Sequence, residues 1–294
     1  MREIVVPTFV SMSQPISRTL EQLADIGVGL VELHGDAPEE HVDLTDAATI
    51  EAISDVVRGL PLKVHSVHCA FSRPSEAAWD ISQPEECERA SAIRNRASVI
   101  RATAQLGARH VIFHPGVRSC GEERMAQSRA SLARLAEIAA DAGTRIAIEN
   151  LPPNHLGGSL HEMELLLEDL DPAVVGFCLD TGHAMLGENP TCDYVRALGR
   201  RIFAIHWHGN DCVEDSHHFP QVAEGEWDGF LAALDEVGCH VPVTLEAAPP
   251  AMTSLQDALA PVRAVLQAGA RPDQCELLPS GRSHLSGPPR KARR

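Results

Sequence analysis

Long apolar runs and paired cysteines are both missing from this 294-residue chain. No window approaches the ~20 apolar residues that a membrane-spanning helix needs, so we expect no membrane partner. The eight cysteines are scattered and form no CxxC pair, which argues against a disulfide framework and against a cysteine-rich zinc ribbon. The first ten residues, MREIVVPTFV, enter a strand-like run at once and leave no room for a signal peptide. We therefore expect a cytoplasmic protein with reduced thiols.

Positive charge is scarce as well. The formal net charge is −16, and the segment from Arg271 to Arg294 holds six basic and two acidic residues, so the rest of the chain carries −20. A body of this charge repels a phosphate backbone at long range. Nucleic acid is therefore not expected as a partner, and a small-molecule substrate is favoured.

Short apolar runs alternate with longer amphipathic segments along the chain. The predicted strands are Glu3–Pro7, Val28–Leu33, Leu62–Val67, Arg109–Phe113, Arg145–Ile148, Val174–Leu179, Ile202–Ile205 and Val241–Leu245. The predicted helices are Ile16–Ile26, Asp46–Arg58, Pro84–Leu106, Glu122–Asp141, His161–Leu170, Asp193–Leu198, Trp227–Val237 and Ser254–Gln267. Eight such pairs predict an α/β fold, a single (β/α)8 TIM barrel over residues 1–269. Residues 270–294 are rich in Pro, Ser, Gly and Arg without apolar periodicity, so we expect a disordered, basic tail.

Metal-binding residue types stand where the predicted strands end. The stretch RIFAIHWHGNDCVEDSHH (201–218) passes from an apolar strand into imidazoles and carboxylates, and five more strands end in the same way. The residues concerned are His68, His114, Glu149, Asp180 with His183, His206, Asp215, His217 and Glu246. Each alone is also explained as a hydrogen-bonded rim histidine, an ion-pair partner or a helix cap. Their repetition at strand ends favours one active site at the carboxyl end of the barrel.

The motifs that carry these residues resemble those of the xylose isomerase-like barrels, which include sugar phosphate isomerases and epimerases and the endonuclease IV branch. The matching stretches are SVHCAF (66–71), FHPG (113–116), IENLP (148–152), CLDTGHA (178–184), IHWHGND (205–211), DSHH (215–218) and TLEA (244–247). They follow strands three to eight in order and extend over about two thirds of the chain.

The resemblance implies up to three sets of metal ligands. A central ion would be held by Glu149, Asp180, His206 and Glu246, as in the single-metal epimerases. In the endonuclease IV branch a second ion shares the central glutamate, here Glu149, with residues matching His68 and His114. A third takes residues matching His183, Asp215 and His217. These donors suit Zn²⁺ first, with Mn²⁺ or Co²⁺ as alternatives, and more than one ion per chain is expected.

Departures from the endonuclease branch favour a small substrate over DNA. That branch opens with a Gly- and His-containing strand and carries DNA-intercalating loops, whereas residues 5–9 read VVPTF. The early loops are also acidic, with Asp36 and Asp43.

Further polar residues near the strand ends are candidates for substrate binding. They are Glu32, His34, Asn150 and His208. Support of the ligands from behind or simple solvation explains each equally well.

Three functions are open at this point. The first is a metal-dependent isomerase or epimerase of a small polyhydroxylated, and in one version phosphorylated, substrate, with Glu149 and Glu246 moving a proton next to a carbonyl. The alternative is a phosphoester hydrolase with a multinuclear zinc centre. The third is a barrel that binds without catalysis, which needs no ligands at all. A homo-oligomer is compatible with any of them.

Overall fold

Eight parallel strands close into a barrel in the computed structural model, which describes residues 2–37, 41–72, 75–117, 122–220, 227–250 and 252–268. The strands are β1 (Ile4–Pro7), β2 (Leu30–His34), β3 (Lys63–His68), β4 (His110–Phe113), β5 (Arg145–Glu149), β6 (Val175–Asp180), β7 (Ile202–His206) and β8 (Val243–Thr244). Each pairs with its neighbours in sequence, and β1 pairs with β8 to close the ring. The predicted (β/α)8 fold is confirmed; the predicted tail, residues 270–294, lies outside the described residues.

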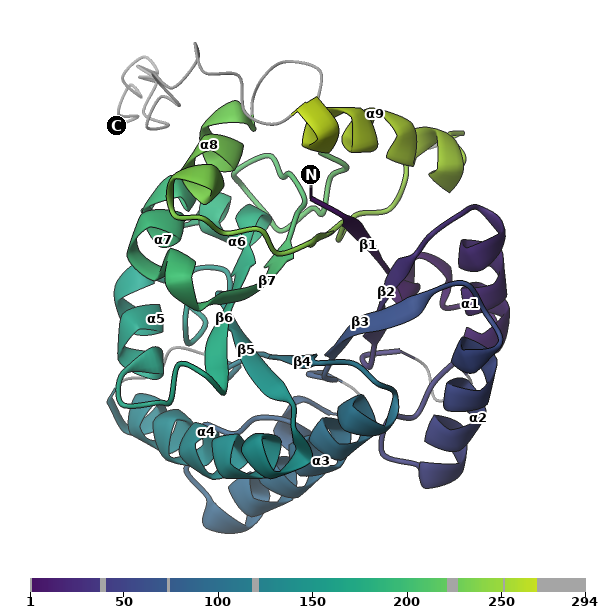
Figure 1. Ribbon diagram of the computed structural model, residues 1–294. Coiled ribbons are helices and arrows are strands. Elements are labelled where there is room, and N and C mark those ends of the chain that lie inside the picture. Colours follow the sequence, from purple (N-terminus) through teal and green to yellow (C-terminus); the bar gives the residue numbers. More distant parts are fainter. Residues whose placement is uncertain are drawn as a thin grey trace, which may run out of the picture.

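Helices surround the ring of strands on its outer side (Figure 1). They are α1 (Ile16–Asp25), α2 (Ala47–Arg58), α3 (Glu86–Gln105), α4 (Glu122–Ala142), α5 (Leu160–Leu167), α6 (Thr181–Leu186), α7 (Thr191–Leu198), α8 (Asp228–Glu236) and α9 (Leu255–Ala268). Three short 3-10 turns are η1 (Thr8–Ser11), η2 (Glu76–Ala78) and η3 (Gly199–Arg201). In the described part of the chain, none of these helices has the length and apolarity that a bilayer crossing requires.

Two apolar layers hold the barrel together. The larger one lies between strands and helices and includes Val31, Val67 and Val111 from the strands, which pack against helix residues such as Ile100 and Leu132. A smaller one fills the inside of the ring with Ile112, Ala147, Cys178, Phe203 and Ala204. Along β4 and β5 neighbouring side chains alternate between these layers, as the two-residue period of a strand requires.

The strand register brings the polar strand ends to one level. Asp180 pairs with His206 across β6 and β7, and His206 pairs with Thr244, two residues before Glu246. On the other side of the ring His34 pairs with His68 and Phe113 pairs with Ile148, which places His114 beside Glu149. Residues at the ends of seven strands, β2 to β8, therefore meet at the carboxyl end of the barrel.

Candidate metal centre and substrate cavity

The central cluster consists of three carboxylates around one imidazole nitrogen. Nδ1 of His206 lies 3.0 Å from Oε1 of Glu149, 2.8 Å from Oε2 of Glu246 and 3.9 Å from Oδ2 of Asp180. All four residues are buried, and one donor atom from each lies within 4.8 Å of the others. The four predicted ligands of a central ion thus share one buried point.

Local structure orients Asp180 at the end of β6. Its Oδ1 accepts the backbone N–H of His183 at 2.7 Å and so caps helix α6. Asn150 clamps the same residue, because its side-chain amide donates to the Asp180 carbonyl at 2.9 Å and its side-chain oxygen accepts the Asp180 N–H at 2.8 Å. Asp180 is therefore both a helix cap and a member of the central cluster.

A second group shares Glu149 with the central cluster. Oε2 of Glu149 lies 3.2 Å from Nε2 of His68 and 3.3 Å from Nε2 of His114, whereas Oε1 faces His206. The two oxygens of one carboxylate thus face two different histidine sets. This is the position of a bridging carboxylate, which fits the second set of ligands implied by the family resemblance.

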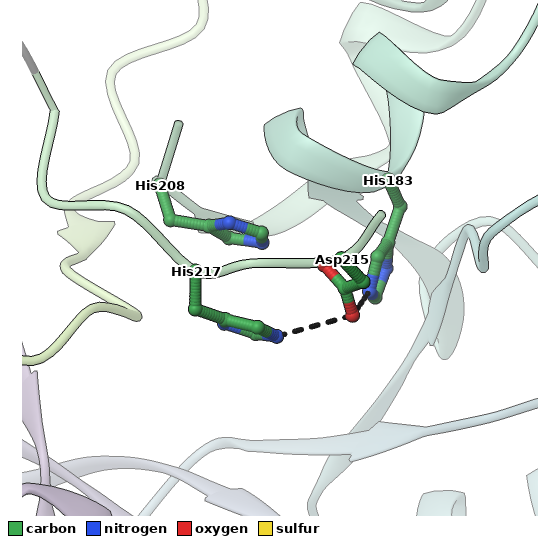
Figure 2. A group of neighbouring side chains, drawn as sticks. All are labelled: His183, His208, Asp215 and His217. Carbon is green, nitrogen blue, oxygen red and sulfur yellow. Dashed lines mark hydrogen bonds and ion pairs between the residues drawn. The ribbon is translucent and has the colours of Figure 1, made fainter. Parts of the chain in front are cut away.

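A third group lies at the rim, next to the loop after β7 (Figure 2). Oδ2 of Asp215 lies 3.1 Å from Nε2 of His183 and 3.2 Å from Nε2 of His217. The backbone of His217 has φ 43°, in the left-handed region that non-glycine residues adopt only where the surroundings impose it. Nδ1 of His217 meets the Glu246 carbonyl at 2.9 Å, so this rim group is tied to the strand end that carries the central cluster.

His208 connects the rim group to the central cluster. Its ring stacks on that of His217, with centroids 4.0 Å apart and planes at 9°, and its Nε2 lies 3.0 Å from Oδ1 of Asp180 (Figure 2). On the other side the ring lies against Gly182, where any Cβ would overlap it. The sequence places His208 among substrate-binding candidates, and the structure places it fully buried behind Asp180.

The electrostatics of the central cluster oppose the effect of burial. Burial disfavours the ionised form of Glu149, but the nearby imidazoles of His206, His114 and His68 outweigh it and hold the pKa of Glu149 well below its usual range. Burial is likewise outweighed at Glu246, chiefly by His206, and the pKa of this carboxyl is also low. Both glutamates are thus anions at neutral pH.

Two histidines beside carboxylates respond in the opposite sense, whereas burial lowers the pKa of His114 in spite of its contact with Glu149. Burial acts to lower the pKa of His183, but Asp180 and Asp215 raise it to about 10. For His217, burial is outweighed by its contact with Asp215, and its pKa rises to about 9. The rim group therefore attracts protons, or another cation, to a site that is buried at His183 and His208 and open to water at Asp215 and His217.

The remaining substrate-binding candidates separate into two kinds. Glu32 is fully buried below the centre, where it accepts a 2.6 Å hydrogen bond from Ser66 Oγ and lies 3.3 Å from Nε2 of His206. Asn150 is buried with both side-chain polar atoms used by Asp180. His34, in contrast, lines the cavity and stacks on His68 with ring centroids 4.7 Å apart. Only His34 of these three faces the space in which a substrate would lie.

A cavity of about 770 Å³ opens above the central cluster and has room for a small sugar. Its polar floor includes His68, His114, Glu149, His183 and Glu246. Its walls include Phe9, Phe71, Trp79, Arg96 and Leu151. The strand-end pattern predicts the floor, and the motifs at 66–71 and 148–152 include Phe71 and Leu151 of the walls. It does not indicate Phe9, in η1, or Arg96, in helix α3.

The donor set fits a divalent cation at the central cluster. Three buried carboxylates converge with one imidazole nitrogen, and burying this much negative charge without a cation is costly. Mixed carboxylate and imidazole donors suit Zn²⁺, Mn²⁺ or Co²⁺. Cys178 is the one thiol of the described residues in this set, with its sulfur within 4.8 Å of donor atoms of Glu149 and His206.

One curated relative shares part of the chain. It is an uncharacterized protein of Methanocaldococcus jannaschii, 26% identical over 191 residues. The match includes 61% of this chain and 63% of the relative, so it spans less than two thirds of that protein's length.

Solved structures of similar fold include sugar epimerases. A D-tagatose 3-epimerase-like protein superposes with a TM-score of 0.75 at 19% identity, covering 91% of this chain and 96% of its own. An L-ribulose 3-epimerase gives 0.73 at 22% identity, with 91% and 94% covered. The IolI protein, whose crystal structure has a bound zinc atom, gives 0.71 at 18% identity, with 90% and 96% covered. Likenesses at these identities establish the fold.

A family model describes most of the barrel. The model of the xylose isomerase-like TIM barrel matches residues 20–265, which include strands β2 to β8 and every residue of the three ligand groups. The chain therefore belongs to the xylose isomerase-like TIM barrel family.

Proposed function

We propose that this protein is a metal-dependent isomerase or epimerase of a small polyhydroxylated sugar. The observation that carries the proposal is the pair Glu149 and Glu246, two ionised carboxylates from β5 and from the end of β8. They flank His206 Nδ1 at 3.0 Å and 2.8 Å on the floor of a sugar-sized cavity. Epimerase neighbours of the same fold and the family membership support the choice.

The metal would be held by Glu149, Asp180, His206 and Glu246. A divalent cation in such a site acts as a Lewis acid and polarises the carbonyl group of a bound sugar. Asn150 and His208 keep Asp180 oriented, through bonds of 2.8–2.9 Å and a contact of 3.0 Å. Glu32 holds Nε2 of His206, so that Nδ1 faces the three carboxylates.

Proton transfer is assigned to the two glutamates. One carboxylate removes the proton from the carbon next to the carbonyl; the other takes up a proton from solvent and gives it to the same carbon or its neighbour. Because Glu149 and Glu246 come from strands three positions apart in the ring, they approach a bound substrate from different sides. Return from the other face inverts the carbon, which is epimerisation.

The decisive measurement is proton exchange. The purified protein, supplied in turn with Zn²⁺, Mn²⁺ and Co²⁺, is incubated in D2O with the four D-ketohexoses and their 6-phosphates. We expect NMR to show deuterium entering next to the carbonyl of at least one of these sugars and an epimer or aldose accumulating with it. No exchange with any sugar under any metal would refute the proposal.

A second candidate, hydrolysis of a phosphoester, is favoured by one observation. Donor groups for two further ions exist, namely His68, His114 and Glu149 at the floor and His183, His208, Asp215 and His217 at the rim. We expect more than one metal ion per chain by mass spectrometry, with two ions ~3.5–4 Å apart if Glu149 bridges them. A single ion would exclude the hydrolase and leave the isomerase.

A further inference from the structure

Arg96 is a buried cation in the wall of the cavity. It lies on helix α3, is 2% exposed, and its guanidinium carbon sits 4.7 Å from the centre of the Phe113 ring. Its Nε donates a hydrogen bond of 2.8 Å to the carbonyl oxygen of Trp79. Phe113 directly precedes His114, so the guanidinium is fastened beside the strand end that contributes to the floor.

One nitrogen of this guanidinium has nothing to bind. Nη1 of Arg96 is buried and has no hydrogen-bond partner, and no carboxylate among the described residues comes within 4.0 Å of the side chain. A buried guanidinium without a partner is costly, and burial lowers its pKa. Such a group is compensated when a ligand brings an acceptor, above all a negatively charged one.

The acidic side chains nearby are occupied by other donors. Asp80 lines the same cavity as Arg96, but one of its oxygens accepts from Arg124 at 2.8 Å and the other from Ser82 Oγ at 2.6 Å. Asp36, also in the wall, accepts hydrogen bonds from the N–H groups of Phe71 and Ser72 and from Ser72 Oγ. Asp80 is thus paired with Arg124, and no carboxylate of the described residues contacts the Arg96 guanidinium.

We propose that Arg96 forms an anion subsite, which binds a carboxylate or phosphate at the end of the sugar remote from the reacting carbon. The proposal rests on the proposed function and narrows its substrate class to acidic sugars. The geometry supports it, because the floor and Arg96 line the same cavity of about 770 Å³, which has room for a ketose with one acidic group. Arginine also matches the planar, two-oxygen shape of carboxylate and phosphate groups.

The test compares sugars that differ at one carbon. Dissociation constants are measured by calorimetry for the four D-ketohexoses, their 6-phosphates and the corresponding 6-carboxylates, in wild type, Arg96→Gln and Arg96→Lys. The matched control is Arg145→Gln, because Arg145 stacks on a phenylalanine in the same way, 5.0 Å from the centre of the Phe203 ring, and does not line the cavity.

We expect wild type to bind at least one acidic ketose roughly ten-fold or more tightly than its neutral parent, the gain typical of a charge-assisted hydrogen bond. Arg96→Gln should abolish this preference without changing the affinity for the neutral parent, Arg96→Lys should restore part of it, and Arg145→Gln should retain it. The 6-phosphates and 6-carboxylates tell which anion is preferred.

Two outcomes would overturn the subsite. One is the absence of a preference for any acidic ketose in wild type, and the other is an equal loss of neutral and acidic binding in Arg96→Gln, which indicates a structural role. Deuterium exchange in the same samples keeps the two proposals apart. Binding that depends on Arg96, without deuterium exchange, supports the subsite and refutes the isomerase. Deuterium exchange together with binding that does not depend on Arg96 supports the isomerase and refutes the subsite.

Discussion

Histidines line both ends of the barrel interior, and their pKa values differ between the two ends. At the carboxyl end His183 contacts Asp180 and Asp215, and its pKa is raised to about 10. At the amino end His65 and His110 lie with ring centroids 5.7 Å apart, and no carboxylate of the described residues comes within 4.0 Å of either. Burial, helped by His65 and Arg145, lowers the pKa of His110 to about 3.

The difference shows what makes a functional cluster. Burial disfavours the charged imidazole at both ends; at His183 the neighbouring carboxylates outweigh it, whereas His110 has no such neighbour among the described residues. At the amino end, the uncharged pair His65 and His110, here called the neutral plug, has one ring nitrogen on each residue without a hydrogen-bond partner. The carboxyl end is a charged site at the mouth of a cavity, which is where active sites of this fold are located.

Removal of the metal should have the largest effect on the carboxyl end of the barrel. Chelation with EDTA is expected to abolish sugar-proton exchange, because the carboxylates lose the cation that they surround. It should leave the far-ultraviolet circular dichroism intact, because the apolar core lies between strands and helices, away from the ligands. Activity should return when the metal is added back. Loss of helical signal on chelation would show a structural metal instead.

Neutralising one of the two glutamates should cause the second largest loss of turnover. Glu246→Gln and Glu149→Gln keep the shape of the site but remove a proton-transfer group, for which a loss of about 10²–10⁴-fold in turnover is expected. The control is Glu236→Gln, an exposed residue of α8 that should keep full activity. Turnover is followed by deuterium exchange. Full activity in Glu246→Gln would remove this residue from the mechanism.

A methyl group at position 182 should disturb the carboxyl end without changing its charge. The His208 ring is confined between Gly182 and the stacked His217, so Gly182→Ala must displace it from Asp180. We expect cation affinity to fall roughly ten-fold, as for other partners that orient a metal ligand, measured by competition with a chromophoric chelator. Gly229→Ala in α8, where an added Cβ meets nothing within 4 Å, is the control. Unchanged affinity in Gly182→Ala would show that His208 does not orient Asp180.

A change at the amino end of the barrel should have the smallest effect, which appears in the pH dependence of the free energy of unfolding. His110 has a pKa of about 3 in the folded protein, against an ordinary value of 6.5 for histidine. Below pH 6.5 His110 binds a proton in the unfolded chain but stays unprotonated in the folded chain. The free energy of unfolding therefore falls as the pH drops toward 3. His110→Gln should remove about 1–2 kcal/mol of the loss between about pH 7 and 5, measured by urea denaturation.

Exposed His240 is the control for this experiment. His240→Gln should follow the wild-type pH profile. A profile of His110→Gln that parallels the wild type would mean that His110 is not held neutral by the fold.

Most of the architecture was predictable from local patterns. The strand and helix periods predict the alternation of all eight strands with helices, and most bounds agree within about two residues. The exceptions are local. Strand β8 is only Val243–Thr244 although Val241–Leu245 is apolar, and helix α6 was not predicted because its six residues include Gly182 and His183, which are weak helix formers.

The site was predictable only in part. The position of a residue at a strand end follows from the end of an apolar run, so the sequence alone indicates Glu149, Asp180, His206 and Glu246 as candidates. It says nothing of how far into the barrel a neighbouring side chain reaches. Glu32 was grouped with substrate-binding residues, and the structure places it below His206 instead.

What the sequence by itself determined is thus the order of the strands and the residue types at their ends, because both depend on neighbours along the chain. The tertiary structure decided which atoms meet. The register shifts between Val31 and Glu32 and between Phe177 and Cys178 turn side chains of β2 and β6 relative to their partners. Pairing of β8 with β7 brings Glu246 to 2.8 Å from His206, and packing of α3 leaves Nη1 of Arg96 without a hydrogen-bond partner beside the cavity. These distances join strands and helices far apart in sequence, so only the closed barrel fixes them.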